Sequence, residues 1–112
     1  MVEYEYCRGC SRSDKRLDNS HIIRRSKRKD LEKVKENITL HCRVCHDLWD
    51  SGNPLKMSRL YDFKPNMEYI YSVDKERWYS LLYNHFNVEI DYEEKDKREE
   101  LYNSIISQNN TN

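Results

Sequence analysis

Apolar residues in the first fifty positions of this chain occur in short runs that are spaced for strands. The stretch "VEYEY" at 2–6 alternates with acidic residues, which predicts a short strand. "LDNSHII" at 17–23 ends in β-branched residues, and "NITLHC" at 37–42 places Ile38 and Leu40 on one face. We expect the last two segments to pair as an antiparallel hairpin. The charged segment between them is expected to form a loop or one helical turn.

The spacing of apolar residues lengthens toward the helical period after the second strand. In "RVCHDLWDSG", Val44, Leu48 and Trp49 lie near helical spacing, and Gly52 follows as a helix stop. We expect a helix over 43–51 that packs back on the hairpin. The chain has only two glycines and two prolines, so it has few tight turns and is not expected to be a multi-stranded β protein.

Helical spacing dominates beyond Pro54. "LKMSRLYDFKP" predicts a short helix followed by a link, and "DKERWYSLLYNHF" predicts a longer helix with Asp74 as its N-cap. "DYEEKDKREELYNSIIS" predicts a last helix. We therefore expect an α+β chain with a small unit over 1–53 and a helical C-terminal extension over 54–112. The apolar stripes of the two longer helices comprise Trp78, Leu81, Leu82 and Phe86, and Leu101, Tyr102, Ile105 and Ile106.

The composition leaves little apolar area for a core. Of the 112 residues, 37% are hydrophobic and 36% are charged. Small domains of this kind usually gain stability from a metal ion or from disulfides. No apolar run is long enough to span a bilayer, and no secretory signal stands at the start. We therefore expect a cytoplasmic protein with reduced thiols and no membrane contact.

The cysteines, Cys7, Cys10, Cys42 and Cys45, form two Cys-x-x-Cys turns separated by 31 residues. Each turn presents two thiolates on one side, so two turns complete a tetrahedral zinc site. Disulfides and buried pairs of free thiols are the alternatives, and the absence of a βαβ pattern weakens a redox interpretation. We predict a structural Zn²⁺ ion, with Gly9 free to take a positive φ in the first turn.

The stretch from Cys7 to about Gly52 resembles the HNH endonuclease family, especially its zinc-stabilised phage-type members. The motifs that carry the resemblance are "CRGC", "SHII" and "NITLHCRVCH", and they span somewhat under half of the chain. The resemblance implies a ββα-metal core, in which two strands and a helix grip one divalent cation. It implies His21 as the general base, Asn37 as the residue that fixes the loop and orients that base, and His46 as a ligand of the cation.

These roles suit phosphodiester hydrolysis, which needs an activated water, charge stabilisation and help for the leaving 3′ oxygen. The family commonly has an acidic metal ligand before the base, where this chain has Ser20, and a hydroxyl is a weaker ligand than a carboxylate. The candidate replacements are Asp50, on the helical face of His46, and Asp18, on the strand face of Ser20. The expected catalytic cation is Mg²⁺, Mn²⁺ or a similar ion, with water and DNA phosphate completing its shell.

Basic residues gather near the expected site, although the formal net charge is zero. Residues 8–29 contain 9 basic residues and 2 acidic ones. The basic run at 24–29 borders the expected cleft, which favours salt-sensitive contacts with DNA phosphates. A solvated charged surface and a nuclear-localisation signal are the alternatives. His41 is expected to be an exposed strand residue. The run comprises Arg24, Arg25, Lys27, Arg28 and Lys29, and Arg8, Arg12, Lys15 and Arg16 extend it.

We predict a metal-dependent HNH endonuclease that cuts duplex DNA in phage or mobile-element DNA processing or in host defence, inside a bacterial or phage-infected cell. The first alternative is a zinc-ribbon module that binds nucleic acid and whose catalytic metal site has decayed at Ser20. The second is an interaction protein, in which zinc is a scaffold and the C-terminal helices form a homodimer or bind another protein. Tail aromatics such as Trp78 are expected to pack into a small core, with stacking on single-stranded bases as the alternative.

Overall fold

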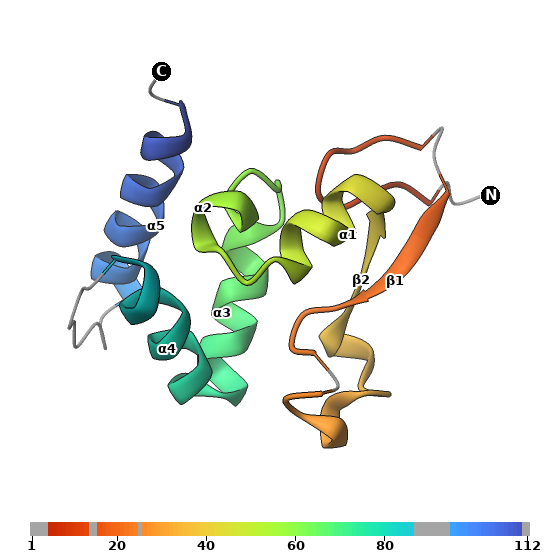
Figure 1. The fold of residues 1–112 in the computed structure, drawn as a ribbon, viewed down its shortest axis with the longest axis horizontal. Coiled ribbons are helices and arrows are strands. Elements are labelled where there is room, and N and C mark those ends of the chain that lie inside the picture. The colour runs from red at the N-terminus through yellow and green to blue at the C-terminus, as the bar shows by residue number, and fades with distance from the viewer. Residues whose placement is uncertain (1–4, 14–15, 25, 87–94, 111–112) are drawn as a thin grey trace.

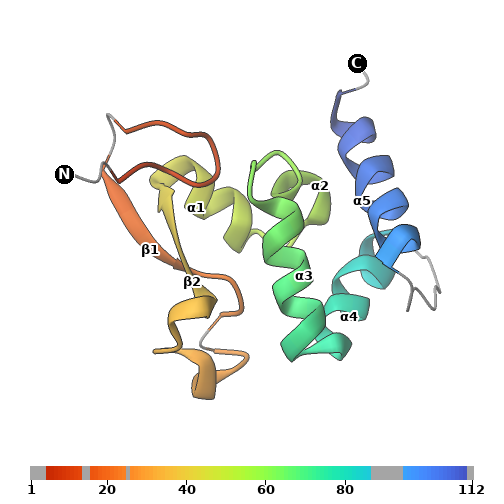
Figure 2. The ribbon, with the colours of Figure 1, turned by 180° about the vertical axis from the view of Figure 1, so that it is seen from behind.

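The computed structural model of the chain describes residues 5–13, 16–24, 26–86 and 95–110. A two-stranded hairpin lies at one end of the molecule and the last helix lies at the other (Figure 1). Figure 2 shows the same arrangement from behind, with α3 between these two ends. The predicted α+β class is thus confirmed. The elements are β1 (Leu17–His21), the 3-10 turns η1 (Lys29–Leu31) and η2 (Lys35–Asn37), β2 (Ile38–Cys42), α1 (Arg43–Asp50), α2 (Pro54–Met57), α3 (Phe63–Val73), α4 (Lys75–Phe86) and α5 (Lys95–Asn110).

The two strands pair antiparallel, as their apolar pattern predicts. The register sets Leu17 opposite Cys42 and His21 opposite Ile38. One end of the hairpin therefore lies beside the cysteine turn that precedes β1, and the other end opens into the loop 22–37. The turns η1 and η2 lie in this loop, so the candidate site residues predicted from the sequence lie at both ends of the hairpin.

Helix α1 follows β2 directly and packs on the hairpin. Trp49 is buried, and its indole N–H donates to the Ile22 carbonyl at 3.0 Å, which ties the helix to the end of β1. The helix stops where the sequence predicts, because Ser51 is its C-cap and Gly52 adopts a φ of 68°. Val44 departs from the predicted apolar stripe, since it is 69% exposed.

The apolar stripes of the C-terminal helices pack together. Asp74 caps α4 as predicted, because its Oδ1 accepts the Arg77 N–H at 3.1 Å. Buried residues from both sides of residue 53 belong to one hydrophobic cluster, and the division of the chain there stays a prediction. The side chain of Phe86 lies outside the described residues. The buried stripe residues are Trp78, Leu81, Leu82, Tyr102 and Ile105.

Two expectations for secondary structure differ from the fold. The sequence predicts a link after α2 that extends to Pro65, and the last part of this prediction is wrong, because α3 already begins at Phe63. Pro65 lies in the first turn of α3, where a backbone N–H has no partner within the helix, so the proline is tolerated. Of the strand predicted at 2–6, residues 2–4 lie outside the described residues and the other two are not in a strand.

Candidate functional site

Four cysteines from three segments converge at one end of the hairpin. Cys7 and Cys10 belong to the turn before β1, Cys42 ends β2, and Cys45 lies in the first turn of α1. Their sulfur atoms all lie within 4.8 Å of one another, and those of Cys10 and Cys42 are 3.8 Å apart. A tetrahedron with zinc–sulfur bonds of about 2.3 Å has edges of about 3.8 Å. The four free thiols therefore fit one structural zinc ion.

The backbone favours the thiolate form of Cys7. The Cys42 N–H donates to the Cys7 sulfur at 3.2 Å. Burial raises the pKa of Cys7, but backbone hydrogen bonds, the largest from Cys42, outweigh it and lower the pKa to about 7. Burial and the neighbouring thiols raise the pKa of Cys45 instead. Zinc binds thiolates, so an ion among the sulfurs would favour loss of the thiol protons.

Gly9 allows the first cysteine turn to approach α1. A Cβ at this position would lie 2.9 Å from Cβ and Sγ of Cys45 and 2.9 Å from Cδ2 of Leu60. The positive φ expected at Gly9 is found at Ser11 instead, where φ is 68°. The Gly9 carbonyl also accepts the Tyr61 N–H at 2.9 Å. The chain needs glycine here because of this close contact and not because of its backbone angle.

A second group of polar side chains lies where α1 faces β1. The His46 ring stands between two carboxylates, with Nδ1 3.1 Å from Asp18 Oδ2 and Nε2 3.1 Å from Asp50 Oδ2. The Asp18 carboxylate can only accept, so Nδ1 is the ring nitrogen that donates to it, and Nε2 faces Asp50 on the other side. The hydrogen bond from His46 outweighs the opposing effect of burial and lowers the pKa of Asp18. His46 is therefore oriented from both sides.

His21 and His46 line a common cavity of about 390 Å³. The two histidines come from different elements, β1 and α1, and the packing of the helix on the hairpin brings them together. Asn19 lies two residues before His21 and shares its strand face. The other residues of the wall are Arg24, Ser26 and Asp50.

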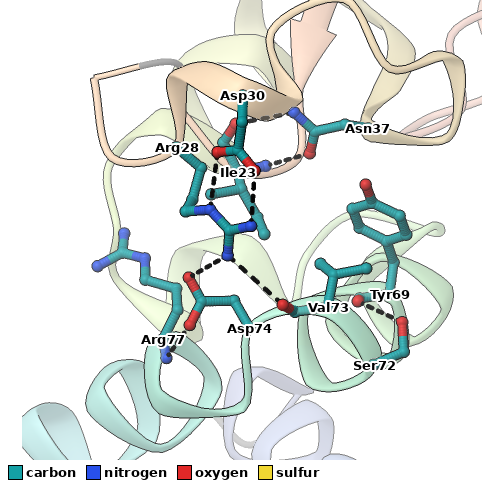
Figure 3. A network of polar contacts seen from close by, with 9 residues as sticks. All are labelled: Ile23, Arg28, Asp30, Asn37, Tyr69, Ser72, Val73, Asp74 and Arg77. Carbon is teal, nitrogen blue, oxygen red and sulfur yellow. Dashed lines mark hydrogen bonds and ion pairs between the residues drawn. The ribbon is translucent and has the colours of Figure 1, made fainter.

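The loop that Asn37 closes holds His21 in place. His21 Nε2 is 2.9 Å from the Glu32 carbonyl, which can only accept, so Nε2 carries the proton of the neutral ring and Nδ1 keeps a lone pair. Asn37 is fully buried, and its amide bonds the N–H and C=O of Ile23 at 2.8 and 3.0 Å (Figure 3). It also donates to the Leu31 carbonyl at 3.1 Å. Asn37 therefore fixes the backbone beside the carbonyl that holds His21.

Ser20 and His41 are buried away from this cavity. Ser20 does not line it, and its Oγ has no hydrogen-bond partner within the described part of the chain. The expectation that His41 is exposed is wrong, since it is 0% exposed and its Nε2 lies 2.9 Å from Asp62 Oδ2. The same oxygen accepts from Thr39 at 3.0 Å and from Asn66 at 2.8 Å. Burial raises the pKa of Asp62, but these hydrogen bonds, chiefly that with His41, lower it overall.

The basic residues that are predicted to bind DNA lie in different environments. Arg24 lines the histidine cavity, whereas Lys27 and Lys29 are exposed and do not line it. Arg25 and Lys15 lie outside the described residues. Among the described residues of this run, Arg24 thus brings a cationic side chain to the cavity.

Arg28 belongs to a contact inside the molecule. Its guanidinium bonds to Asp30 at 2.8 and 2.9 Å and to Asp74 at 3.3 Å (Figure 3). Hydrogen bonds with Asp30 and then Asp74 raise the pKa of Arg28. The side chain therefore joins the loop 22–37 to the start of α4, and the structure does not bring it to the cavity with Arg24.

Several groups around the histidines were not predicted. Asn19 could have been found, because strand alternation places it on the face of His21. Ser26 and the Glu32 carbonyl lie in the irregular loop, where the sequence carries no signal of their position. The network at Asp62 was equally hidden, because its partners come from distant segments.

No protein-family model, curated protein or solved structure matches this chain. None of the helices in the described ranges combines the length and apolarity needed to cross a bilayer. Within those ranges, the four cysteines are the one group of three or more Cys, His, Asp or Glu side chains that lies close enough to share an ion. Function must therefore be inferred from the chemistry of the two sites.

Proposed function

We propose that this chain is a zinc-stabilised, metal-dependent endonuclease of the HNH type, which hydrolyses phosphodiester bonds of duplex DNA. The observation that supports the proposal most is the cavity shared by His21 and His46. A strand, a helix and a cation-binding histidine around one cavity are what the ββα-metal core of that family requires. Its setting would be phage or mobile-element DNA processing or host defence in a bacterial or phage-infected cell.

His21 has the geometry of a general base. The Glu32 carbonyl fixes its Nε2–H, so Nδ1 is the atom that can take a proton from an attacking water. An imidazole is suited to this step near neutral pH. Asn37 contributes by holding the loop and not by touching the substrate.

His46 and Asp50 are the residues that would hold Mg²⁺ or Mn²⁺. Nε2 of His46 and Asp50 Oδ2 lie together, and both residues line the cavity. Asp18 would then keep the Nδ1–H of the ring, as carboxylates commonly do behind a metal-bound histidine. A cation bound there supplies charge stabilisation at the phosphate and at the leaving 3′ oxygen. Asp50 thus replaces the acidic ligand for which Ser20 is too deeply buried.

The second candidate is a non-catalytic zinc module that binds nucleic acid. The observation that favours it is the placement of Asp18 and Asp50 at opposite nitrogens of His46. One cation cannot contact both carboxylates and the ring in this arrangement. The pocket therefore offers two ligands, His46 and Asp50, whereas the family commonly has a further acidic ligand. Weak cation binding would leave a protein that binds DNA without cutting it.

Plasmid cleavage separates the two candidates. Zinc-loaded wild type, His21→Ala and Asp50→Asn are incubated with supercoiled plasmid and either Mg²⁺ or Mn²⁺, and the DNA affinity of each is measured without these ions. The nuclease predicts cleavage by the wild type and at least ~100-fold slower cleavage by His21→Ala at equal affinity. Lys97→Ala, which changes an exposed residue on α5, is the control and should cleave normally. Binding without cleavage by the wild type under every divalent ion would support the binding module.

A further inference from the structure

A second hollow lies on the opposite side of α1 from the histidine cavity. It measures about 520 Å³ and borders the cysteine cluster, because Cys10, Cys42 and Cys45 are among its lining residues. Val44 and Leu48 of α1 line it, and the helical turn of about 100° per residue directs them away from His46 and Asp50. Four arginines from three segments also line the hollow, namely Arg12, Arg16, Arg43 and Arg59.

The lining of this hollow combines cationic and apolar groups. Guanidinium groups bind phosphate oxygens through paired N–H donors. Val44 and Leu48 offer an apolar surface of the kind that packs against sugar rings, and Val44 is 69% exposed. In the part of the chain that the structure describes, no carboxylate forms an ion pair with Arg59, which lies in the turn between α2 and α3. Its charge is therefore available to a ligand.

Arg43 connects this hollow to the proposed catalytic site. Its Nη1 is 3.6 Å from Asp18 Oδ2, the oxygen that also contacts His46. The two hollows are thus neighbours across the first turn of α1. A duplex with one phosphate beside His21 and His46 would extend over adjacent surface, where the arginines lie.

We propose that the arginine hollow binds the phosphate backbone of the DNA duplex outside the cleaved bond. This inference rests on the proposed function for the identity of its ligand. It assigns Arg43 and Arg59 to the DNA-binding surface, and it gives the chain two regions of phosphate contact, on either side of α1. An acidic protein segment would be the alternative occupant, but the link from Arg43 through Asp18 to His46 favours DNA, because one duplex could then contact both sides of α1.

The salt dependence of DNA binding tests the hollow without requiring cleavage. Zinc-loaded protein without Mg²⁺ or Mn²⁺ is titrated against a fluorescent duplex of about 20 base pairs at several salt concentrations. Loss of one phosphate contact in Arg59→Ala should reduce the slope of log K against log salt by about 0.9 and the affinity about eightfold at about 0.1 M salt. Arg59→Lys should keep most of the slope. Lys97→Ala removes an exposed charge from α5, which does not line the hollow, and should change neither value.

The outcomes separate the hollow from the catalytic proposal. Wild-type affinity and slope in Arg59→Ala, at unchanged zinc content and melting temperature, would overturn the inference even if the wild type cleaves plasmid. Equal weakening in Lys97→Ala would also overturn it, because overall charge and not the hollow would then control binding. A reduced slope in Arg59→Ala with no cleavage under any divalent ion would support the hollow and remove the hydrolytic function. Binding of an acidic peptide but not of duplex by the wild type would exclude DNA as the occupant.

Discussion

Replacing Asn37 by alanine removes the side chain that closes the loop beside His21. Asn37 is fully buried, and its amide satisfies the N–H and C=O of Ile23 at 2.8 and 3.0 Å. It also bonds the Leu31 carbonyl, but that carbonyl keeps a second partner in the Val34 N–H at 3.2 Å. The substitution therefore leaves two backbone groups of Ile23 without a partner in a buried position.

Each unsatisfied buried group costs about 1–3 kcal/mol, so we expect Asn37→Ala to lower the free energy of unfolding by about 3 kcal/mol. For a chain of this size, that loss corresponds to a fall in melting temperature of roughly 12 °C. Asn37→Asp keeps the acceptor for the Ile23 N–H but replaces the donor amide with an oxygen that faces the Ile23 and Leu31 carbonyls. Two acceptors then face each other, so Asn37→Asp should be at least as destabilising as Asn37→Ala. Both variants should also cleave DNA more slowly, because the Glu32 carbonyl that holds His21 follows Leu31 directly.

Thermal unfolding of zinc-loaded protein, followed by circular dichroism, measures the effect. Asn19→Ala is the matched control, since Asn19 is an exposed asparagine on β1 and its loss should change stability by less than about 0.5 kcal/mol. The reasoning is refuted if Asn37→Ala melts within a few degrees of Asn19→Ala. A stable Asn37→Asp variant would refute it as well, because the hydrogen-bond directions would then be unimportant.

Other parts of the molecule make separate predictions. Cys45→Ser should lose the bound zinc ion in native mass spectrometry and lose cooperative unfolding, and a normal melt without zinc would contradict the structural role. Gly9→Ala should lower zinc affinity in a competitive chelator titration, because its Cβ would lie 2.9 Å from Cys45, and wild-type affinity would show that the turn is not tightly packed. Arg28→Ala should lower the melting temperature without changing DNA affinity, whereas Lys27→Ala should weaken DNA binding alone, and the opposite pattern would reverse their assignments. Folding lowers the pKa of Asp62, so the ionised carboxylate stabilises the folded protein. This contribution to the free energy of unfolding is complete above the unfolded-state pKa of about 3.9, and it is lost as the pH falls through the lower pKa of the folded state. Asp62→Asn should therefore lose less stability than the wild type as the pH falls below about 4, and equal losses would argue against this contribution.

Local spacing explains which elements could be predicted. The hairpin, α1 and the described parts of α4 and α5 follow from alternation or helical stripes, and Gly52 and Asp74 mark ends because capping is local. Helix α3 escaped prediction, although Phe63, Met67 and Ile70 are spaced for one helical face and are buried. The proline within its first turn suggested a link, and only the packing of that face shows that the helix continues through it.

Long-range partners explain what the sequence could not reveal at the sites. The cysteine cluster is predictable because each Cys-x-x-Cys turn is a local motif with a known preference for zinc. His41 is buried because Asp62 meets it 21 residues later, and Arg28 is held by Asp74, 46 residues later. The sequence left open whether Asp18 or Asp50 accompanies His46. The fold places both at 3.1 Å, on different nitrogens of the ring.

Single-turnover cleavage of an end-labelled DNA duplex, with and without free imidazole, tests the proposed role of His21 most directly. Wild type and His21→Ala are compared with Mn²⁺ at protein concentrations that saturate the DNA, so that a difference in affinity cannot contribute. We predict cleavage by the wild type, its loss in His21→Ala, and partial recovery when imidazole replaces the missing base. Cleavage by His21→Ala at the wild-type rate, or no cleavage by the wild type at all, would contradict hydrolysis at this site.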